Sequence, residues 1–237
     1  MASQTYLRRR GELQTYFDRT AVDAWAKLTS DAPLGRIRAT VRAGRDRMRD
    51  TLLTWLPEDL TERRVLDAGC GTGALSVAAA KRGASVIAID LSPTLVGLAD
   101  ERSATLYEPP GQINFQVGDM LSPGLGNFDH VVAMDSLIHY RASDMVNALL
   151  ALTPRVNHSI LFTFAPRTPA LTAMHAFGRL LPRGDRAPAI EPVSASHLKR
   201  LLLAQPGFAD WQITNDCRIS SGFYISHAWK LTRRRPE

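Results

Sequence analysis

Cysteine and long apolar runs are both scarce in this sequence. Only two cysteines, Cys70 and Cys217, occur among the 237 residues, and they are far apart and lack metal-ligand spacing. The sequence therefore predicts neither a disulfide framework nor a metal site. No stretch approaches the roughly 18 consecutive apolar residues that cross a bilayer, and no apolar run follows the basic start. We therefore expect a cytoplasmic protein without a membrane span.

Acidic residues are also in deficit, because 29 lysines and arginines outnumber 23 aspartates and glutamates and leave a net charge of +6. The arginine excess is concentrated before residue 50, at Arg8, Arg9, Arg10, Arg36, Arg38, Arg42, Arg45, Arg47 and Arg49. Such a surface attracts anions, but nucleic acid, a membrane face and a carboxylated ligand suit it equally well. With 45% hydrophobic and 22% charged residues, the chain has the composition of a folded globular protein.

From Arg63 onward, short β-branched runs alternate with helical segments, which is typical of βαβ units around a parallel sheet. We expect strands at residues 64–68, 85–90, 113–117, 129–134 and 159–164. Helices are expected at residues 73–82, 93–103, 144–152 and 194–204. Ser92 is the expected N-cap of the second helix. Two final strand-like runs, 210–218 and 222–231, predict an antiparallel hairpin. The predicted fold class is α/β, with a mostly parallel, Rossmann-like sheet.

Two regions depart from this alternation. Prolines bracket a short apolar helix at residues 171–181, which predicts a lid inserted at about residues 165–193 and lying over the sheet. Residues 1–60 are expected to form a helical cap that binds substrate, and residues 61–237 a cofactor-binding domain.

The region from Gln14 to Trp55 has helical periodicity. An apolar face is expected from Ile37, Val41, Met48, Leu52 and Trp55. Beside it runs an arginine stripe, defined by Arg38, Arg42, Arg45 and Arg49. The stripe is either a solvated charged face or an electropositive wall for an acidic substrate.

A glycine-rich loop at residues 69–73 joins the first predicted strand to the first helix, where nucleotide-like ligands bind in open α/β sheets. Glycines allow a sharp turn and let backbone N–H groups approach a ligand. The spacing of Gly69, Gly71 and Ala74 also satisfies the dinucleotide fingerprint, so the glycines alone do not identify the ligand. Asp67 favours S-adenosylmethionine, because a carboxylate suits a cationic sulfonium and amino-acid group and repels a pyrophosphate.

Acidic residues also end the second and third predicted strands. Asp90 can accept hydrogen bonds from both ribose hydroxyls, a device that nicotinamide-dependent proteins share. In Gly118-Asp119-Met120, Asp119 is expected to accept from the adenine amino group and Met120 to pack on the ring, with an ordinary turn aspartate as the alternative. Together with Asp67, these groups fall at successive strand ends, as one ligand site requires.

These motifs resemble those of the class I S-adenosylmethionine-dependent methyltransferases over about residues 63–164. The resemblance implies the class I methyltransferase fold, with S-adenosylmethionine as cofactor and S-adenosylhomocysteine as product. It implies cofactor contacts at Asp67, Ala68, Gly69, Cys70, Gly71, Gly73, Asp90, Leu91, Gly118, Asp119, Met120 and Met134.

Other segments resemble the magnesium-protoporphyrin IX methyltransferase family, in its purple-bacterial form, over nearly the full length. They are Tyr16-Phe17-Asp18-Arg19-Thr20, Trp25, residues 36–45 and Met134-Asp135-Ser136-Leu137-Ile138-His139-Tyr140. The resemblance implies methylation of one porphyrin propionate during bacteriochlorophyll synthesis. Expected substrate contacts are Tyr16, Phe17, Trp25, Arg36, Arg38, Arg42, His139, Tyr140 and His175. Members from oxygenic phototrophs carry a tyrosine shortly after the tryptophan, whereas residues 26–29 contain none, so its role is not carried over.

The implied reaction needs little acid–base chemistry. A propionate is ionised near neutral pH, so the enzyme must align the reacting atoms and exclude water rather than supply a strong base. His139 is the candidate catalytic residue, orienting the propionate or ligating magnesium axially, with a core or capping histidine as the alternative. The aromatic side chains would enclose the flat macrocycle, with ordinary core packing of these side chains as the alternative. The arginines would form an ion pair with a carboxylate of the porphyrin.

Other functions stay open at this point. Basic charge allows a methyltransferase of RNA or of another small molecule. Residues 134–140 contain no proline of the kind that base-amine methyltransferases place there, and neither cysteine has a nucleophile's setting, so no nucleic-acid partner is expected. A nicotinamide-dependent oxidoreductase fits the glycine spacing but not Asp67. A porphyrin carrier or regulatory protein would bind both ligands without turnover.

The resemblance also implies a protein partner. A free porphyrin is poorly soluble and photoreactive, so we expect delivery by the large, porphyrin-binding subunit of magnesium chelatase. Peripheral contact with the inner or photosynthetic membrane through the basic N-terminal helix is a further expectation.

Overall fold

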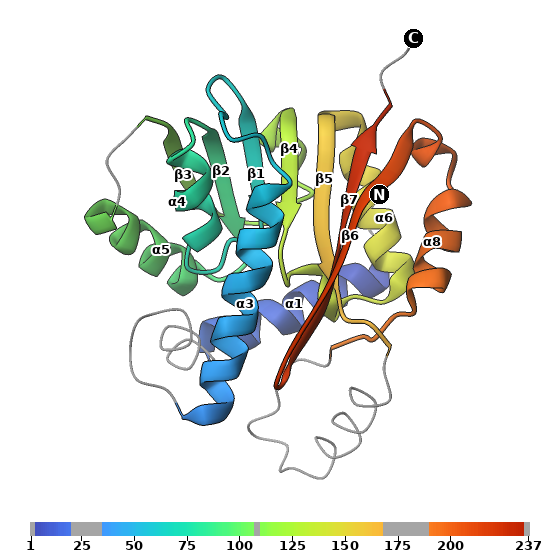
Figure 1. The fold of residues 1–237 in the computed structure, drawn as a ribbon, viewed down its shortest axis with the longest axis horizontal. Helices are drawn as coiled ribbons and strands as arrows, with labels where there is room; N and C mark the ends of the chain where they lie inside the picture. Colours follow the sequence, from blue (N-terminus) through green and yellow to red (C-terminus); the bar gives the residue numbers. More distant parts are fainter. Residues whose placement is uncertain (1–2, 20–34, 107–109, 168–189, 235–237) are drawn as a thin grey trace.

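The computed structural model describes residues 3–19, 35–106, 110–167 and 190–234. A central sheet is flanked by helices on both faces (Figure 1). Its strands are β1 (Arg64–Ala68), β2 (Ser85–Asp90), β3 (Gln112–Val117), β4 (Phe128–Ala133), β5 (Val156–Phe164), β6 (Trp211–Ser221) and β7 (Tyr224–Arg233). The α-helices are α1 (Gln4–Arg19), α3 (Arg36–Thr54), α4 (Ala74–Ala80), α5 (Pro93–Leu106), α6 (Ala142–Leu152) and α8 (Ala195–Leu203). Short 3₁₀ turns are η1 (Pro123–Leu125), η2 (Leu137–His139), η3 (Thr153–Arg155) and η5 (Pro206–Phe208).

The seven strands lie in the order β3-β2-β1-β4-β5-β7-β6. Strands β1 to β5 pair in parallel, and β7 runs antiparallel to both β5 and β6. The predicted mostly parallel sheet with a C-terminal hairpin is thereby confirmed. Because the order reverses direction between β1 and β4, the loops after these strands open a crevice at the sheet edge.

Local chemistry explains where the helices begin. Helix α5 starts at Pro93, and Ser92 Oγ accepts a hydrogen bond from the Leu95 N–H at 3.2 Å. Helix α8 starts after Ser194, whose Oγ accepts from the His197 N–H at 3.3 Å. These side chains satisfy N–H groups that have no partner within the helix. The N-cap predicted at Ser92 is confirmed.

Apolar side chains form one core cluster on each face of the sheet. Met48 and Leu52 of α3 pack with residues of α4 on one face, whereas Leu149 of α6 and Leu198 of α8 pack on the other. The apolar face predicted for α3 is wrong at its first residue, because Ile37 is 57% exposed. The beginning of α3 extends past the sheet (Figure 1), so the sheet does not cover that side chain.

Helix α1 corrects another prediction. It begins at Gln4, before the Gln14 at which helical periodicity starts, and it lies across the edge where the parallel strands end (Figure 1). Tyr6 and Leu13 are buried against the rest of the protein, although the residues between them are mostly polar. Contact with the sheet edge, rather than an apolar stripe, therefore stabilises this helix.

Several predictions fall on residues outside the described ranges. They are Trp25, the lid helix at residues 171–181 and His175. The ends of the predicted lid are described: Pro166 bridges Val193, and the Glu191 N–H donates to the Ile138 carbonyl at 2.9 Å. None of the helices in the described ranges combines the length and the apolar character needed to cross a bilayer.

Candidate active site

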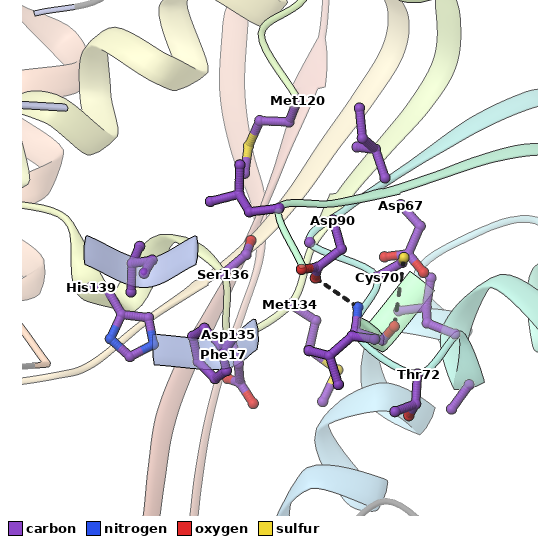
Figure 2. Close-up of a pocket in the computed structure, with 18 of the residues that line it drawn as sticks. Phe17, Asp67, Cys70, Thr72, Asp90, Met120, Met134, Asp135, Ser136 and His139 are labelled. Atoms are coloured by element: carbon purple, nitrogen blue, oxygen red, sulfur yellow. Dashed lines mark hydrogen bonds between the residues drawn. The ribbon is translucent and has the colours of Figure 1, made fainter. Parts of the chain in front are cut away.

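A cavity of about 350 Å³ lies at the carboxyl ends of the parallel strands. It is lined by the loop after β1, the ends of β2, β3 and β4, and side chains of α1 and α3. In Figure 2, Asp67, Cys70 and Asp90 lie on one side, and Phe17, Asp135 and His139 lie on the other. We call these the cofactor side and the acceptor side. The volume is in the usual range for a small-molecule site.

The glycine loop builds the cofactor side. Gly69 has φ +88°, in the left-handed region that favours glycine, and its N–H donates to the Ile89 carbonyl at 2.8 Å. The Gly71 N–H donates to Asp90 Oδ2 at 2.9 Å (Figure 2). A Cβ added to Gly69 would lie 2.4 Å from the Ser136 Cβ, so the loop also touches the acceptor side. The tight turn therefore depends on both local conformation and space.

Two acids face this loop, Asp67 buried and Asp90 half-buried. Asp67 Oδ2 accepts from Ser76 Oγ at 2.5 Å, and burial raises the pKa of Asp67 to about 7, with a smaller contribution from the Asp90 carboxylate. Asp90 Oδ1 also accepts from the Ser92 N–H at 3.0 Å, and burial raises its pKa too. Each carboxylate keeps unused lone pairs for a ligand. Burial disfavours the ionised form of both acids, and a cation that reaches them would favour it.

The thiol of Cys70 lines the same wall. Burial raises the pKa of this thiol well above its usual value, and the Asp67 and Asp90 carboxylates add to the shift. The thiol therefore stays protonated and is no nucleophile.

Asp119 has the turn contact that the sequence offered as its alternative, and its contact with the adenine amino group stays a prediction. Its Oδ1 accepts from the Leu121 N–H of its own turn at 2.9 Å, and it lines the cavity. Helix α1 adds two contacts: Tyr6 Oη donates to Asp119 Oδ1 and Arg10 Nη1 donates to Oδ2, both at 2.8 Å. Burial raises the pKa of Tyr6, so its hydroxyl stays protonated and donates. The sequence showed no sign of these α1 partners.

Aromatic side chains enclose the acceptor side. His139 is buried, and its ring lies edge-on to Phe17 with 5.9 Å between centroids. Tyr140 stacks on Tyr6 at 4.8 Å, and Tyr16 lies edge-on to Phe17 at 5.2 Å. The predicted acceptor residues from α1 and from the turn after β4 are thus brought together, although they are far apart in the sequence.

The arginine stripe divides along α3. Arg42, Arg45 and Arg49 line the cavity, whereas Arg36 and Arg38 are exposed and outside it. The helix start extends beyond the sheet, so its first arginines face solvent. Arg45 pairs with Asp135 at 2.6 Å and Arg49 with Asp46 at 2.9 Å, so acids of the same wall balance part of its positive charge. The solvated alternative describes the first turn of the helix, and an electropositive wall for an acidic substrate stays a prediction from Arg42 onward.

Most predicted site residues within the described ranges line the cavity. They are Asp67, Gly69, Cys70, Gly71, Asp90, Leu91, Gly118, Asp119, Met120, Met134, Phe17, Arg42, His139 and Tyr140. Ala68 is buried within β1, and Gly73 at φ +78° precedes α4 against Phe115; neither lines the cavity.

Several further lining residues were not predicted as site residues, among them Tyr6, Arg45, Asp135 and Ser136. Asp135 and Ser136 lie two and three positions after the last residue of β4, so their place at a strand end is the signal that could have identified them.

Comparison with known proteins adds to this geometry. Residues 65–157 match the family model described as "Methyltransferase domain". Residues 133–233 match the model described as "Magnesium-protoporphyrin IX methyltransferase C-terminus". The chain is 46% identical over 222 residues to magnesium-protoporphyrin O-methyltransferase of Rhodobacter capsulatus. The aligned residues cover 93% of this chain and 95% of that relative. The chain belongs to the magnesium-protoporphyrin IX methyltransferase family.

Membership in this family makes the protein an S-adenosylmethionine-dependent O-methyltransferase. A relative from Synechocystis with the same name is 29% identical over 93% of this chain and 95% of its own length. The crystal structure of magnesium protoporphyrin IX methyltransferase from Synechocystis with bound SAH superposes with a TM-score of 0.82 at 26% identity, covering 94% of this chain and 99% of that one.

Proposed function

We propose that this protein transfers a methyl group from S-adenosylmethionine to one propionate carboxylate of magnesium-protoporphyrin IX, giving the monomethyl ester for bacteriochlorophyll synthesis. The observation that carries the proposal is a single cavity in which the glycine loop faces an aromatic and arginine wall. A family member with this arrangement has the two binding surfaces that methyl transfer between a cationic donor and an anionic acceptor requires.

The cofactor side suits S-adenosylmethionine. Asp67 and Asp90 offer acceptors to a cationic amino-acid group and to ribose hydroxyls, and Met120 offers an apolar surface to a flat ring. When bound, the cofactor supplies an electrophilic methyl group on a positively charged sulfur. A bound cation favours the ionised form of the Asp67 carboxyl and so lowers the pKa that burial raises.

The acceptor side needs to align and dehydrate a carboxylate. A propionate is ionised near pH 7, so no strong base is required. Orientation contributes about 7–11 kcal/mol in favourable cases, and a dry site removes solvent that stabilises separated charges. We assign Arg42 to ion pairing with a carboxylate, and His139 to orienting the reacting propionate or ligating magnesium axially.

We further propose that residues 1–60 act as a substrate-binding cap on the domain formed by residues 61–237. Helix α1 supports this division, because Asp18 accepts from Thr94 Oγ1 at 2.7 Å and Arg9 pairs with Glu191 at 3.0 Å. These contacts tie α1 both to the cofactor side and to one end of the insertion at residues 165–193. The remaining assignments to Tyr16, Trp25, Arg36, Arg38 and His175 stay predictions.

The function is tested by incubating the protein with S-adenosylmethionine and either magnesium-protoporphyrin IX or metal-free protoporphyrin. Mass spectrometry should find one added methyl on the magnesium porphyrin. Equal methylation of both porphyrins would keep the carboxyl methyltransferase and remove an axial role for His139. If S-adenosylmethionine binds but neither porphyrin reacts, RNA and small metabolites are the next acceptors. Binding of both ligands without transfer would identify a carrier.

The partner and the location can be tested separately. We propose that the large subunit of magnesium chelatase delivers the porphyrin, because the free pigment is poorly soluble. Immobilised protein should retain that subunit more strongly when porphyrin is bound.

We also propose a cytoplasmic enzyme that touches the membrane at the beginning of α3, where Arg36, Ile37 and Arg38 are exposed. Cosedimentation with anionic vesicles, lost in the R36A/R38A variant, would support this contact.

A further inference from the structure

Asp135 has a left-handed backbone conformation, which few residues other than glycine adopt. It follows Met134 at the end of β4 and has φ +54°; among the described non-glycine residues only Glu62 shares a positive φ. The left-handed conformation costs an L-residue about 1–2 kcal/mol, and surrounding contacts must offset this cost. Such a residue is retained where its side chain or the turn it creates has a use.

Side chains from α3, β5 and β7 converge on the Asp135 carboxylate. Arg45 Nη1 lies 2.6 Å from Oδ2, and Tyr224 Oη lies 3.1 Å from both oxygens. Thr163 Oγ1 and Ser226 Oγ lie 3.2 and 3.3 Å from Oδ1. The Asp135 N–H also donates to Thr163 Oγ1 at 2.7 Å. The side chain is only 4% exposed, so these partners replace water almost completely.

The Tyr224 hydroxyl is protonated and can donate to the Asp135 carboxylate. Burial raises the pKa of Tyr224 well above its usual value, and the Asp135 carboxylate adds to the shift, so the hydroxyl remains a donor. Gly44 of α3 allows the approach, since a Cβ there would lie 2.5 Å from Tyr224 Cδ1. Helix α3 and the β6–β7 hairpin are therefore held together at this carboxylate.

The next residues along the chain enter the cavity. Ser136 Oγ is buried without a hydrogen-bond partner in the described part of the chain, and it lines the cavity beside Gly69. Turn η2 follows and ends with His139. The conformation of Asp135 thus determines the direction in which the chain leaves β4, and with it the placement of Ser136 and His139 (Figure 2).

We infer that Asp135 is a positioning residue, which fixes the turn carrying Ser136 and His139 against the arginines of α3 so that the acceptor carboxylate meets both in one geometry. This inference rests on the proposed function. Asp135 does not itself bind the cofactor: its two oxygens are occupied by Arg45, Tyr224, Thr163 and Ser226.

The test is the D135N variant, with D129N as its matched control. Asp129 is also an aspartate of β4, but it lies at the other end of the strand and accepts from the Arg64 N–H at 2.9 Å. In D135N a neutral amide replaces the carboxylate. The variant therefore lacks the two anionic oxygens that accept from Arg45 and from the hydroxyls of Tyr224, Thr163 and Ser226. We expect its kcat for magnesium-protoporphyrin IX to fall 10- to 100-fold while the Kd for S-adenosylmethionine stays within threefold. D129N should keep kcat within twofold.

A readout independent of turnover is the histidine ring signals in ¹⁵N-labelled protein. D135N should shift the His139 signals and leave those of His130, which lies in β4 and bonds Ser159 Oγ at 2.7 Å, unchanged. Wild-type kcat in D135N, or parallel losses of kcat and cofactor binding, would refute the inference. A wild-type protein that methylates no porphyrin would instead refute the proposed function.

Y224F keeps the inference testable if D135N fails to fold. The ring stays beside Gly44, and only the hydroxyl contacts of 3.1 Å are lost. We expect kcat to fall 3- to 10-fold with an unchanged Kd for S-adenosylmethionine and shifted His139 signals. Unchanged kcat and His139 signals in folded Y224F would refute positioning through this carboxylate.

Discussion

The cofactor side of the cavity is joined mostly by contacts between neighbouring stretches of chain, whereas distant stretches build the acceptor side. Asp90 accepts from the Gly71 N–H, 19 positions away. Arg45 and Asp135 are 90 positions apart, and the rings of Phe17 and His139, which lie edge-on to each other, are 122 positions apart. The first kind of contact follows from one βαβ unit, and the second exists only once helices α1 and α3 have packed on the sheet.

This difference predicts how each side responds to substitution. A change in the glycine loop alters backbone N–H groups that nothing else can replace. A change on α3 moves side chains, and the cofactor loop should not respond. The two sides touch at Gly69 and Ser136, so only there should one substitution affect both ligands.

The largest effect is expected for G69A. The variant places an L-side chain at φ +88° and a Cβ 2.4 Å from the Ser136 Cβ. Left-handed strain and overpacking together cost about 3 kcal/mol, which corresponds to a loss of roughly 100-fold or more in S-adenosylmethionine affinity. Isothermal titration calorimetry measures this loss. The control is G124A, where an added Cβ meets nothing within 4 Å. Wild-type affinity in G69A would contradict this view of the loop.

A smaller effect, confined to the acceptor side, is expected for G44A. The new Cβ would lie 2.5 Å from Tyr224 Cδ1 and should displace α3 from the hairpin. Overpacking costs about 1–3 kcal/mol, so kcat/KM for the porphyrin should fall about 30-fold, with cofactor affinity unchanged. G97A in α5 is the control, because its Cβ meets nothing within 4 Å. An equal loss of cofactor affinity in G44A would show that the two sides are coupled.

The next effect in size concerns single arginines of the stripe. R42A removes a cation from the cavity wall. It should raise the KM for magnesium-protoporphyrin IX about tenfold, because this is the loss in affinity expected when one partly exposed charge-assisted hydrogen bond is removed. R38A removes an exposed arginine of the same helix and should change KM less than twofold. Steady-state kinetics at saturating S-adenosylmethionine measure both. Equal weakening of cofactor binding in R42A would remove its acceptor role.

The smallest effect is a pH dependence of the cofactor side. The Asp67 carboxyl has a pKa of about 7 in the free protein, and a cationic ligand favours its ionised form. Binding should therefore release a proton, and S-adenosylmethionine affinity should rise by up to about tenfold between pH 6 and pH 8. Calorimetry in buffers of different ionisation enthalpy counts the proton. D67N should bind more weakly at pH 8 and lose this dependence; an unaltered dependence would assign the proton elsewhere.

Much of the fold could be predicted because the responsible signals are local. β1 and β2 were predicted with their observed bounds, and Ser92 caps α5 as expected. Burial on both faces gives parallel strands continuous apolar runs, which periodicity detects. Helix α1 was missed before Gln14, because its buried residues, Tyr6 and Leu13, are separated by polar ones.

By itself the sequence determined the cofactor side. Glycine conformation, strand-end acids and helix caps depend on residues within one βαβ unit, so their positions follow from the order of residue types. Only the tertiary structure decided the acceptor side. Arg42 and Arg38 are four residues apart on one stripe, yet only Arg42 lines the cavity. The end of β6 reaches α3 at Thr40, where Ser221 Oγ donates to the Thr40 carbonyl at 3.2 Å, and Arg38 lies before this contact. Periodicity identifies the face of a helix, and packing alone determines what that face meets.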